Sequence, residues 1–481
     1  MPVLENLKPA RVFHFFEELC AIPHGSGNTK AISDYCVRFA KKLGLEYHQD
    51  ELNNVIIIKP ATKGYENSPA VIVQGHLDMV TEKAPECSID FTKDGLQLRV
   101  DGDFVYAEGT TLGGDDGIAV AMALALLESE DLPHPRLEAV FTVDEEIGME
   151  GAQALDVSPL TGRRMLNIDS EDEGVLTVSC AGGARANLSA RFELAACDLP
   201  VYTLRVSGLT GGHSGTEIDK GRANANLLMG RVLYRLSCAL PLRIVSCAGG
   251  LKDNAIPLAC TATLALTNAD AARAQQIIGE FDASLKREYA AADPGVCVQL
   301  NETGTAARAM TMEESARFAR MLTLMPNGIA EMSRDIEGLV QTSCNLGVLK
   351  LDNGELFACS AVRSSVATQK QMLLDRFSAL CEAFGGSMTV TGDYPAWEYC
   401  RESVLRETMV RVFEAQYGRA PKIEAIHAGL ECGLFAGKLE GLDAVSFGPD
   451  LFDIHTTRER MSISSVQRIW QYLCQVLKEL K

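Results

Sequence analysis

The strongest constraint on the fold is a set of apolar, strand-like runs that end abruptly in ionisable side chains. Residues 139–152 read AVFTVDEEIGMEGA, in which a β-branched and aromatic run stops at Asp144, Glu145 and Glu146 before a turn glycine. Three adjacent carboxylates repel one another, and burying them costs hydration. This stretch therefore predicts either solvent or a bound cation beside the three acids.

Ionisable side chains also follow two further strand-like runs and occupy two loops. AVIVQGHLDMV contains His76 and Asp78 at the end of its apolar run, and MLNIDSED contains Asp169. Asp115 lies in the glycine turn of TLGGDDGIAVA, where a helix begins, and His455 follows the last strand in VSFGPDLFDIHTTRE. Taken singly, each has an ordinary explanation, such as a structural histidine or a helix cap. Taken together, they are typical of a metal site.

The donor types narrow the choice of metal. Imidazole and carboxylate together suit Zn²⁺, Mn²⁺ or Co²⁺. Two histidines together with even three of these carboxylates are too many ligands for one tetrahedral ion that keeps an open position. They suit two ions about 3.5–4 Å apart that share a bridging carboxylate and a bridging water. The sequence therefore predicts two divalent cations, which also supply the positive charge that the acids require.

The order of the predicted elements indicates an α/β fold. Helices are expected to cover a mixed, largely internal sheet. The strands are predicted at 53–58, 70–73, 137–143 and 165–168, with a buried helix at 117–130. The same α/β pattern returns after Pro395 and ends in a helix that begins at Ser464.

The middle of the chain has a different pattern. From about residue 185 the predicted order is β-α-β-β-α-β, which is ferredoxin-like, and a second, weaker copy is predicted at 311–392. We therefore predict an inserted α+β domain of residues 185–394, built from two ferredoxin-like halves. It interrupts a discontinuous α/β domain of residues 1–184 and 395–481.

Bulk composition excludes some functions. The formal net charge of −19 disfavours nucleic-acid binding, since phosphate backbones are repelled. The 15 cysteines form no C-x-x-C pair and many lie in apolar patterns, which favours a reducing cytoplasm. The first residues lack the pattern of a signal peptide, and no apolar run is long enough for a membrane span. We expect a cytoplasmic protein without membrane or nucleic-acid partners.

Eight motifs, in order along the chain, carry a family resemblance. They are GHLDMV, TTLGGDDG, DEEIGMEGA, NIDSED, GGHSG, NAIP, HAGLECG and the late FGPD…HTT. Together they resemble the zinc metallopeptidases that include carboxypeptidase G2, bacterial dipeptidases and carnosinases. The resemblance covers essentially the whole chain and is far more specific than any single motif. It implies a catalytic domain made of the two outer parts and a lid made of the inserted domain.

The resemblance implies roles for the strand-end residues. Five of them fall on metal-ligand positions: His76, Asp115, Glu146, Asp169 and His455. Asp115 falls on the bridging position, and Asp78 on the carboxylate that orients His76. Glu145 falls on the general base, which implies that it faces the bridging water while Glu146 binds metal. Asp144 has no implied role, and we expect it to point to solvent or to cap a turn.

The resemblance also implies residues that contact the substrate. His213, in GLTGGHSG, falls on a lid histidine that steadies the oxyanion, either within one chain or across a homodimer. Asn254 and Arg363 are candidates to bind the C-terminal carboxylate of the substrate, although a turn asparagine and a surface arginine are equally good readings. Glu431, in HAGLECG, either binds the free amino terminus of the substrate or stabilises its loop.

The implied reaction is metal-dependent hydrolysis of dipeptides with a free amino terminus, by an Xaa-His or broad-specificity dipeptidase. An aminoacylase, another amidohydrolase or an aminopeptidase on the same scaffold is the alternative, and a non-catalytic metal-binding scaffold is a remote one. Two departures from the family pattern stand out. Asp116, in GGDDG, adds a negative charge beside the bridging ligand, and Thr456-Thr457-Arg458 follows His455 where relatives have S-P-x. The second departure puts a preference for C-terminal histidine in doubt.

Overall fold

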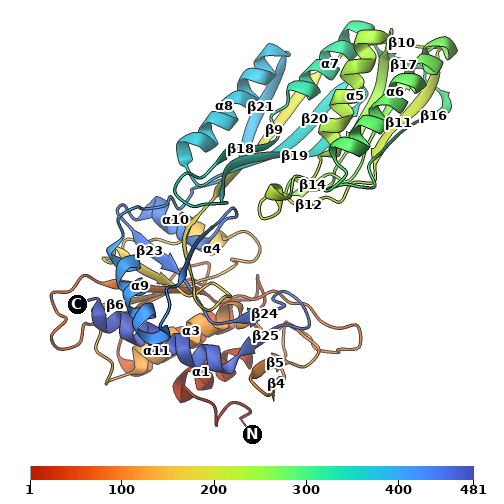
Figure 1. Cartoon of the computed structure of the whole chain (residues 1–481). Coiled ribbons are helices and arrows are strands. Elements are labelled where there is room, and N and C mark those ends of the chain that lie inside the picture. The colour runs from red at the N-terminus through yellow and green to blue at the C-terminus, as the bar shows by residue number, and fades with distance from the viewer. Residues whose placement is uncertain (1) are drawn as a thin grey trace. The chain divides into compact units, whose positions relative to one another are not determined.

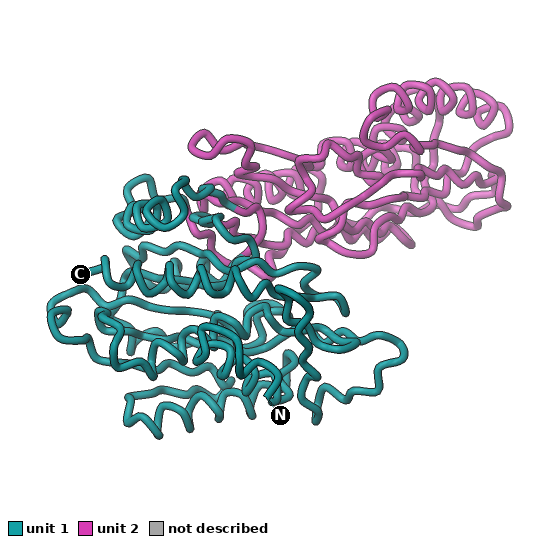
Figure 2. The backbone as a smooth tube through the Cα atoms, turned by 60° about the horizontal axis from the view of Figure 1, so that its bottom comes forward, with its two compact units in different colours: residues 1–179, 399–425, 430–481 teal, residues 180–398, 426–429 magenta. Residues whose placement is uncertain are grey.

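The chain folds into two compact units. The computed structural model describes residues 2–481 (Figure 1). Unit 1 comprises residues 1–179, 399–425 and 430–481, and unit 2 comprises residues 180–398 and 426–429 (Figure 2). The sequence places the boundaries at 184/185 and 394/395, and it gives no sign that residues 426–429 leave unit 1.

Unit 1 contains a mixed sheet of eight strands. In spatial order the strands are β1 (Glu46–Gln49), β2 (Val55–Lys59), β6 (Leu137–Thr142), β3 (Val71–His76), β7 (Arg164–Asn167), β23 (Asp443–Ser446), β8 (Val175–Cys180) and β22 (Lys422–Ile426). The four strands β6, β3, β7 and β23 run parallel, whereas β2 is antiparallel to β6. Because parallel strands end at the same edge, the residues that follow these four strands gather there.

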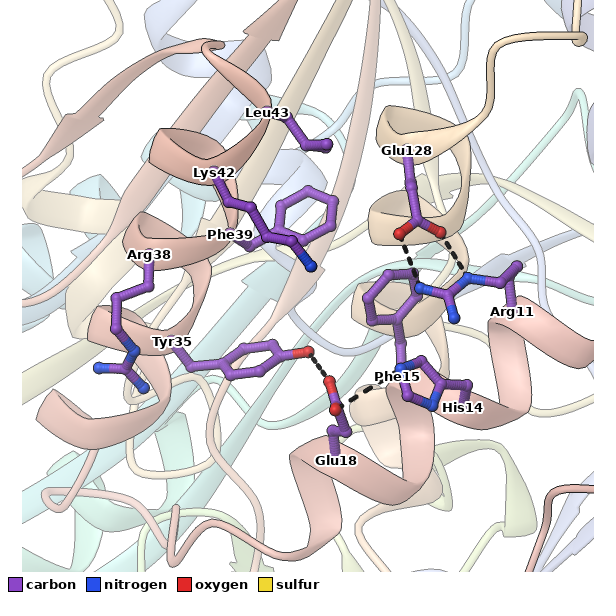
Figure 3. A pocket seen from close by; sticks show the side chains of 10 residues that line it. All are labelled: Arg11, His14, Phe15, Glu18, Tyr35, Arg38, Phe39, Lys42, Leu43 and Glu128. Carbon is purple, nitrogen blue, oxygen red and sulfur yellow. Dashed lines mark hydrogen bonds and ion pairs between the residues drawn. The ribbon is translucent and has the colours of Figure 1, made fainter.

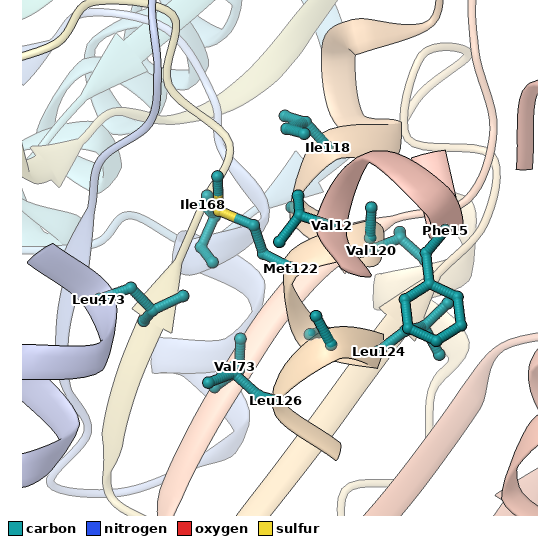
Figure 4. Packing of buried hydrophobic residues seen from close by; sticks show 14 of the residues in the cluster. Val12, Phe15, Val73, Ile118, Val120, Met122, Leu124, Leu126, Ile168 and Leu473 are labelled. Carbon is teal, nitrogen blue, oxygen red and sulfur yellow. The ribbon is translucent and has the colours of Figure 1, made fainter. Parts of the chain in front are cut away.

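In the described part of unit 1, from residue 2 onward, seven helices accompany this sheet. They are α1 (Ala10–Cys20), α2 (Lys30–Leu43), α3 (Gly114–Glu128), α4 (Glu150–Ala154), α9 (Val404–Tyr417), α10 (Glu431–Lys438) and α11 (Ile463–Glu479). Helix α3 is apolar on nearly every face and is buried along most of its length, as its sequence predicts. It packs against α1, where Val12 and Phe15 lie beside Val120 and Leu124 (Figure 4). This core fixes the helix whose first turn carries Asp115.

A small antiparallel sheet holds the loop that contains His455. Its strands, in order, are β24 (Leu451–Phe452), β25 (Arg460–Ser462), β5 (Phe104–Ala107) and β4 (Leu98–Asp101). Residues 453–459 connect β24 to β25, and His455 lies in this connection with φ of 59°. The pairing of Leu451 with Met461 closes the loop at its base.

Unit 2 is built on one nine-stranded sheet with four helices. The strands are β9 (Gly182–Arg191), β11 (Pro200–Ser207), β13 (Arg243–Gly249), β15 (Cys260–Ala265), β16 (Cys297–Thr305), β18 (Gly328–Met332), β19 (Val340–Asp352), β20 (Glu355–Ser364) and β21 (Gly386–Tyr394). The helices are α5 (Ala225–Ala239), α6 (Asn268–Glu288), α7 (Met312–Leu324) and α8 (Ala367–Ala383). Short strands form two further pairs: β10 (Leu194–Ala196) with β17 (Arg308–Met310), and β12 (Gly212–His213) with β14 (Ala255–Ile256).

The sheet of unit 2 consists of two ferredoxin-like halves joined edge to edge. The first half has the spatial order β16-β11-β15-β13 with α5 and α6, and the second has β21-β9-β20-β19 with α7 and α8. Antiparallel pairing of β13 with β19 joins the two halves. The predicted duplication is therefore present, but the range 311–392 for the second copy is incomplete. Its first strand is β9, which precedes the whole first half in the sequence.

Among the helices of residues 2–481, none combines the length and hydropathy that crossing a bilayer requires.

Candidate active site

Five predicted metal ligands of unit 1 meet at the edge of the eight-stranded sheet where the parallel strands end. His76 is the last residue of β3, Asp169 follows β7, and Glu146 follows β6. Asp115 comes from the first turn of α3, and His455 from the loop after β24. Within residues 2–481, Asp115, Glu146 and His455 form one group whose donor atoms lie within 4.8 Å of one another. His76 and Asp169 belong to a neighbouring group of the same kind.

The two carboxylate oxygens of Asp115 face different histidines. Oδ1 lies 3.1 Å from Nε2 of His76, and Oδ2 lies 3.1 Å from Nε2 of His455. Nε2 of His76 is also 3.8 Å from Asp169, and Nε2 of His455 is 2.9 Å from Glu146. Ligands of a tetrahedral zinc ion lie about 3.3 Å apart, given metal–ligand bonds of about 2.0–2.1 Å. The donor set therefore fits two ions that share Asp115.

The three consecutive acids have three different surroundings. Oε1 of Glu146 faces His455, whereas Asp144 accepts a hydrogen bond of 2.6 Å from the backbone N–H of Gly27. Asp144 thus links two loops, which is a turn-capping role. Burial raises the pKa of Glu145 to about 8, and the charges of Glu431 and Glu146 add to the shift. Glu145 is therefore a carboxylate poised to hold a proton near neutral pH.

Asp78 holds both the His76 loop and the loop of the three acids. Its carboxylate accepts the Ser26 hydroxyl at 2.8 Å and the backbone N–H of Glu145 at 3.1 Å. Nδ1 of His76 is 3.0 Å from the backbone carbonyl of Asp78 and 3.5 Å from its carboxylate. Because a carbonyl can only accept, the proton of His76 sits on Nδ1 and the lone pair of Nε2 faces the donor group.

The pKa values of several side chains at this edge of the sheet are shifted in the direction that favours positive charge. Burial alone would lower the pKa of His76, but Asp115 and Asp78 raise it well above its usual range. Hydrogen bonds to Asp115 and Glu146 raise the pKa of His455 to about 10. Burial raises the pKa of Asp169, with repulsion from Asp116 as a further cause. Each shift adds protons to a cluster with an excess of negative charge, which divalent ions would neutralise.

Asp116, one of the two departures from the family pattern, is almost fully buried beside His76. Its Oδ2 accepts the backbone N–H of His76 at 3.2 Å. The peptide between Asp115 and Asp116 is cis. One Asp116 carboxylate oxygen also lies with His76 and Asp169 in a group of potential metal donors. Asp116 therefore holds the backbone of the proposed ligand His76 by a hydrogen bond.

In unit 2, His213 is held by backbone N–H groups. Its Nδ1 accepts from the N–H of Gly215 at 3.3 Å and of Thr216 at 3.1 Å. This fixes the neutral tautomer with its proton on Nε2, the nitrogen left to donate to a ligand. Burial lowers the pKa of His213, and the nearby charge of Arg363 lowers it further.

Arg363 and Asn254 lie near His213 in unit 2. A side chain added at Gly215 would come within 3.2 Å of Nε of Arg363 and 3.1 Å of Cε1 of His213. Nη1 of Arg363 donates to the Tyr394 hydroxyl at 3.2 Å, while its buried Nε has no hydrogen-bond partner in the described part of the chain. Asn254 accepts the N–H of Ser214 through its backbone carbonyl and is exposed. The three predicted substrate contacts of unit 2 are therefore neighbours.

His427 joins this neighbourhood, although the sequence reasoning assigned it no role. Residues 426–429 belong to unit 2, and Nε2 of His427 lies 2.7 Å from the hydroxyl of Ser343. Burial lowers the pKa of His427 to about 3, and the charges of Arg363 and His213 contribute. The motif HAGLECG contained the signal, because a histidine close to a predicted substrate contact is unusual in a chain with 8 histidines.

Glu431 is fully buried in unit 1 at the first turn of α10. Its Oε2 accepts the amide of Gln74 and the hydroxyl of Thr142, both at 2.6 Å. Gln74 and Thr142 lie on β3 and β6, so Glu431 ties α10 to the centre of the sheet. Burial raises its pKa to about 7. Of the two roles considered for Glu431, this geometry favours stabilising the loop.

A separate pocket of unit 1 lies between α1, α2 and the end of α3 and contains none of the predicted site residues (Figure 3). Its acids are paired within the pocket. Glu128 accepts two hydrogen bonds from Arg11, and Glu18 accepts the hydroxyl of Tyr35. The proposed metal donors at the sheet edge therefore take no part in this pocket.

The fold and the donor set together define a metal-dependent hydrolase. The chain matches the model of Peptidase family M20/M25/M40 over residues 72–479. It is 35% identical over 482 residues to the cytosol non-specific dipeptidase of Escherichia coli (strain K12), an alignment that covers 100% of this chain and 99% of that protein. The chain belongs to peptidase family M20/M25/M40, which confirms the family resemblance of its motifs.

Solved structures give the same result. Aminoacylhistidine dipeptidase from Vibrio alginolyticus superposes with a TM-score of 0.94 at 36% identity, covering 99% of this chain and 98% of that one. The aminopeptidase PepT from Bacillus cereus ATCC 10987 covers 98% of this chain and 99% of its own, with a TM-score of 0.56 at 17% identity, and shares the fold.

Proposed function

We propose that this chain hydrolyses dipeptides with a free amino terminus, with two divalent ions held by His76, Asp115, Glu146, Asp169 and His455. The observation that carries the proposal is the geometry of Asp115, whose two oxygens each face a different histidine at 3.1 Å. Family membership and the names of two relatives, both dipeptidases aligned along nearly their full length, support the substrate class.

The donor atoms favour zinc, with manganese or cobalt as alternatives, because they are imidazole nitrogens and carboxylate oxygens without thiolate. When bound, the ions supply positive charge that lowers the pKa of a water and polarises the scissile carbonyl. In this assignment Asp115 is the bridging ligand. Asp78 keeps His76 in the tautomer whose Nε2 faces the metal position.

Glu145 acts as the general base. It takes a proton from the attacking water at its carboxylate and delivers that proton to the leaving amine. Its support is its position next to the proposed ligand Glu146. Burial raises its pKa, and the positive charge of bound ions would lower the pKa again, so that the carboxylate could accept a proton at neutral pH.

The residues of unit 2 are proposed to bind the substrate. His213 donates its Nε2–H to the carbonyl oxygen as negative charge develops there. Arg363 and Asn254 bind the C-terminal carboxylate, for which a guanidinium can provide two parallel hydrogen bonds. We assign Glu431 to holding the loop of α10 and not to the substrate amine. The cysteine pattern and the cytosolic relative support a cytoplasmic location.

The test is a hydrolysis assay on purified, metal-replete protein with dipeptides, tripeptides and N-acetylated amino acids. We expect dipeptides to be cleaved, chelator to abolish cleavage, and added Zn²⁺, Mn²⁺ or Co²⁺ to restore it. Preferential cleavage of N-acetylated amino acids or tripeptides would instead identify an aminoacylase or aminopeptidase. Full activity in excess chelator would overturn the metal assignment.

A further inference from the structure

Glu459 is a buried carboxylate that the proposed reaction does not use. It lies four residues after His455, immediately before β25, and only 3% of its surface is exposed. Its own backbone N–H donates to the carbonyl of Thr456 at 3.1 Å, so it belongs to the folded loop that carries His455. A buried glutamate requires strong partners, because its charged form loses hydration.

The partners of Glu459 are three consecutive backbone N–H groups at the start of α3. Oε2 accepts from Leu112 at 2.8 Å and from Gly113 at 3.3 Å, and Oε1 accepts from Gly114 at 2.8 Å. Hydrogen bonds to a charged acceptor are stronger than neutral ones, and the N-terminus of a helix favours a negative charge. The next residue in the chain is Asp115.

The two glycines of the TLGGDDG motif are explained by this contact. Gly113 has a backbone φ of 66°, a conformation that residues other than glycine rarely adopt. A side-chain carbon added at Gly114 would lie 3.3 Å from Oε1 of Glu459 and 3.2 Å from Leu451. The turn is therefore shaped so that its backbone can approach the carboxylate closely.

Asp115 needs such a restraint. Its backbone has φ of −81° and ψ of 105°, which is not helical, so the hydrogen-bond ladder of α3 does not fix its orientation. The turn that precedes it sets where its carboxylate points. That turn is bound to the same loop that positions His455, whose Nε2 lies 3.1 Å from Oδ2 of Asp115.

We propose that Glu459 is a positioning residue of the metal centre: it binds the turn at residues 112–114 to the His455 loop and so sets Asp115 against His455. This inference rests on the proposed function, in which Asp115 bridges two ions and His455 binds one of them. Glu459 is not one of the proposed ligands, and it acts through the backbone N–H groups of residues 112–114, which precede the bridging ligand.

The test compares Glu459→Gln with Glu138→Gln. Glu138 is a matched control, since it is fully buried and accepts the backbone N–H groups of Thr161 and Gly162, but at the opposite end of β6 from the proposed ligands. We measure Zn²⁺ dissociation constants by competition with a chromophoric chelator, the visible absorption of the Co²⁺-loaded protein, and the melting temperature of the metal-free protein.

We expect Glu459→Gln to weaken zinc binding by about 10–100-fold and to change the cobalt spectrum, as loss of a ligand-supporting group does. Glu138→Gln should lower the melting temperature while zinc affinity stays within about 2-fold of wild type, a range that follows from its distance from the ligands. Glu459→Asp should also weaken binding, because it keeps the charge but loses the reach to the N–H groups.

Three results would overturn the inference. Wild-type zinc affinity in Glu459→Gln would make Glu459 an ordinary loop cap. If Glu459→Asp binds zinc with wild-type affinity while Glu459→Gln does not, the negative charge at position 459 would matter and the reach of its side chain to the N–H groups would not. Failure of both variants to fold even with metal would make Glu459 a requirement of the whole fold. If instead wild-type protein binds no divalent ion, the proposed function itself fails, which separates the two hypotheses.

Discussion

The histidines of two regions have pKa values shifted in opposite directions. One region is the set of proposed metal ligands in unit 1, and the other is the cluster of His213, Arg363 and His427 in unit 2. In unit 1, neighbouring carboxylates raise the pKa values of His76 and His455. In unit 2, burial lowers the pKa values of His213 and His427, with the charge of Arg363 as a further cause. The first site has excess negative charge and suits cations, whereas the second keeps neutral imidazoles beside a guanidinium and suits a substrate anion.

The largest expected effect separates metal binding from proton transfer within unit 1. His76→Ala should lose both bound metal and activity, because a ligand is removed. Glu145→Gln should keep its metal but lose turnover by about 10²–10⁴-fold, since a general base is removed. Elemental analysis and kcat on the same preparations check this. Full metal occupancy in His76→Ala, or a tenth of wild-type activity in Glu145→Gln, would contradict the assignments.

In unit 2, His213→Gln should lower kcat by about 10²–10³-fold, as loss of an oxyanion donor does. Metal content should stay at the wild-type level, because His213 is not a proposed ligand. Mixing this variant with Glu145→Gln shows whether His213 serves its own chain. Recovered activity in the mixture means that the chain is a homodimer in which His213 acts across the interface. An unchanged kcat would remove His213 from the mechanism.

A smaller effect is expected for the proposed carboxylate-binding residue. Arg363→Ala should reduce kcat/KM by about 10–100-fold, the cost of losing hydrogen bonds to a charged group. The loss should appear mainly in KM, and a dipeptide amide, which lacks the carboxylate, should show little difference between the variant and wild type. Equal losses for the acid and the amide would mean that Arg363 only supports the fold through Tyr394.

The smallest effect concerns the acid sensitivity of unit 2. The pKa of His427 is about 3 in the folded chain and about 6.5 unfolded, so the unfolded state binds the extra proton as pH falls. Stability from this group is present above pH 6.5 and decreases below it, by about 2 kcal/mol between pH 7 and pH 5. His427→Gln should remove this dependence. The pH dependence is measured by the amide-exchange protection of β19, corrected for intrinsic exchange rates. If protection falls as steeply with pH in His427→Gln as in wild type, His427 is not the group responsible.

The sequence could predict which side chains gather at the sheet edge because the ends of apolar strands can be recognised in it. His76, Glu146 and Asp169 each follow an apolar run, and the parallel pairing of β3, β6 and β7 brings their ends together. The bridging arrangement of Asp115 was not readable from spacing and came from the family resemblance. The backbone of Asp115 is not helical, and the turn before it is bound to Glu459, more than 300 positions further along the chain. Motif spacing does not show a contact between positions so far apart.

Strand β9 was missed for a different reason. In residues 184–191 every second position is buried and the positions between are exposed or half-buried, but the buried positions hold mostly alanine, which has low strand propensity. The period of two was present, whereas the bulky residues that usually reveal it were absent. His427 was missed because short motifs do not show that residues 426–429 leave one folded unit for the other.

The position of β23 in the sheet has a consequence for protein synthesis. This strand, residues 443–446, fills the place between β7 and β8, which leave the ribosome more than 260 residues earlier. Until then, the nascent chain lacks both β23 and the proposed ligand His455, so neither the eight-stranded sheet nor the proposed metal centre can be complete. Unpaired strand edges invite wrong pairing, so β7 and β8 stay open to it until β23 has been made.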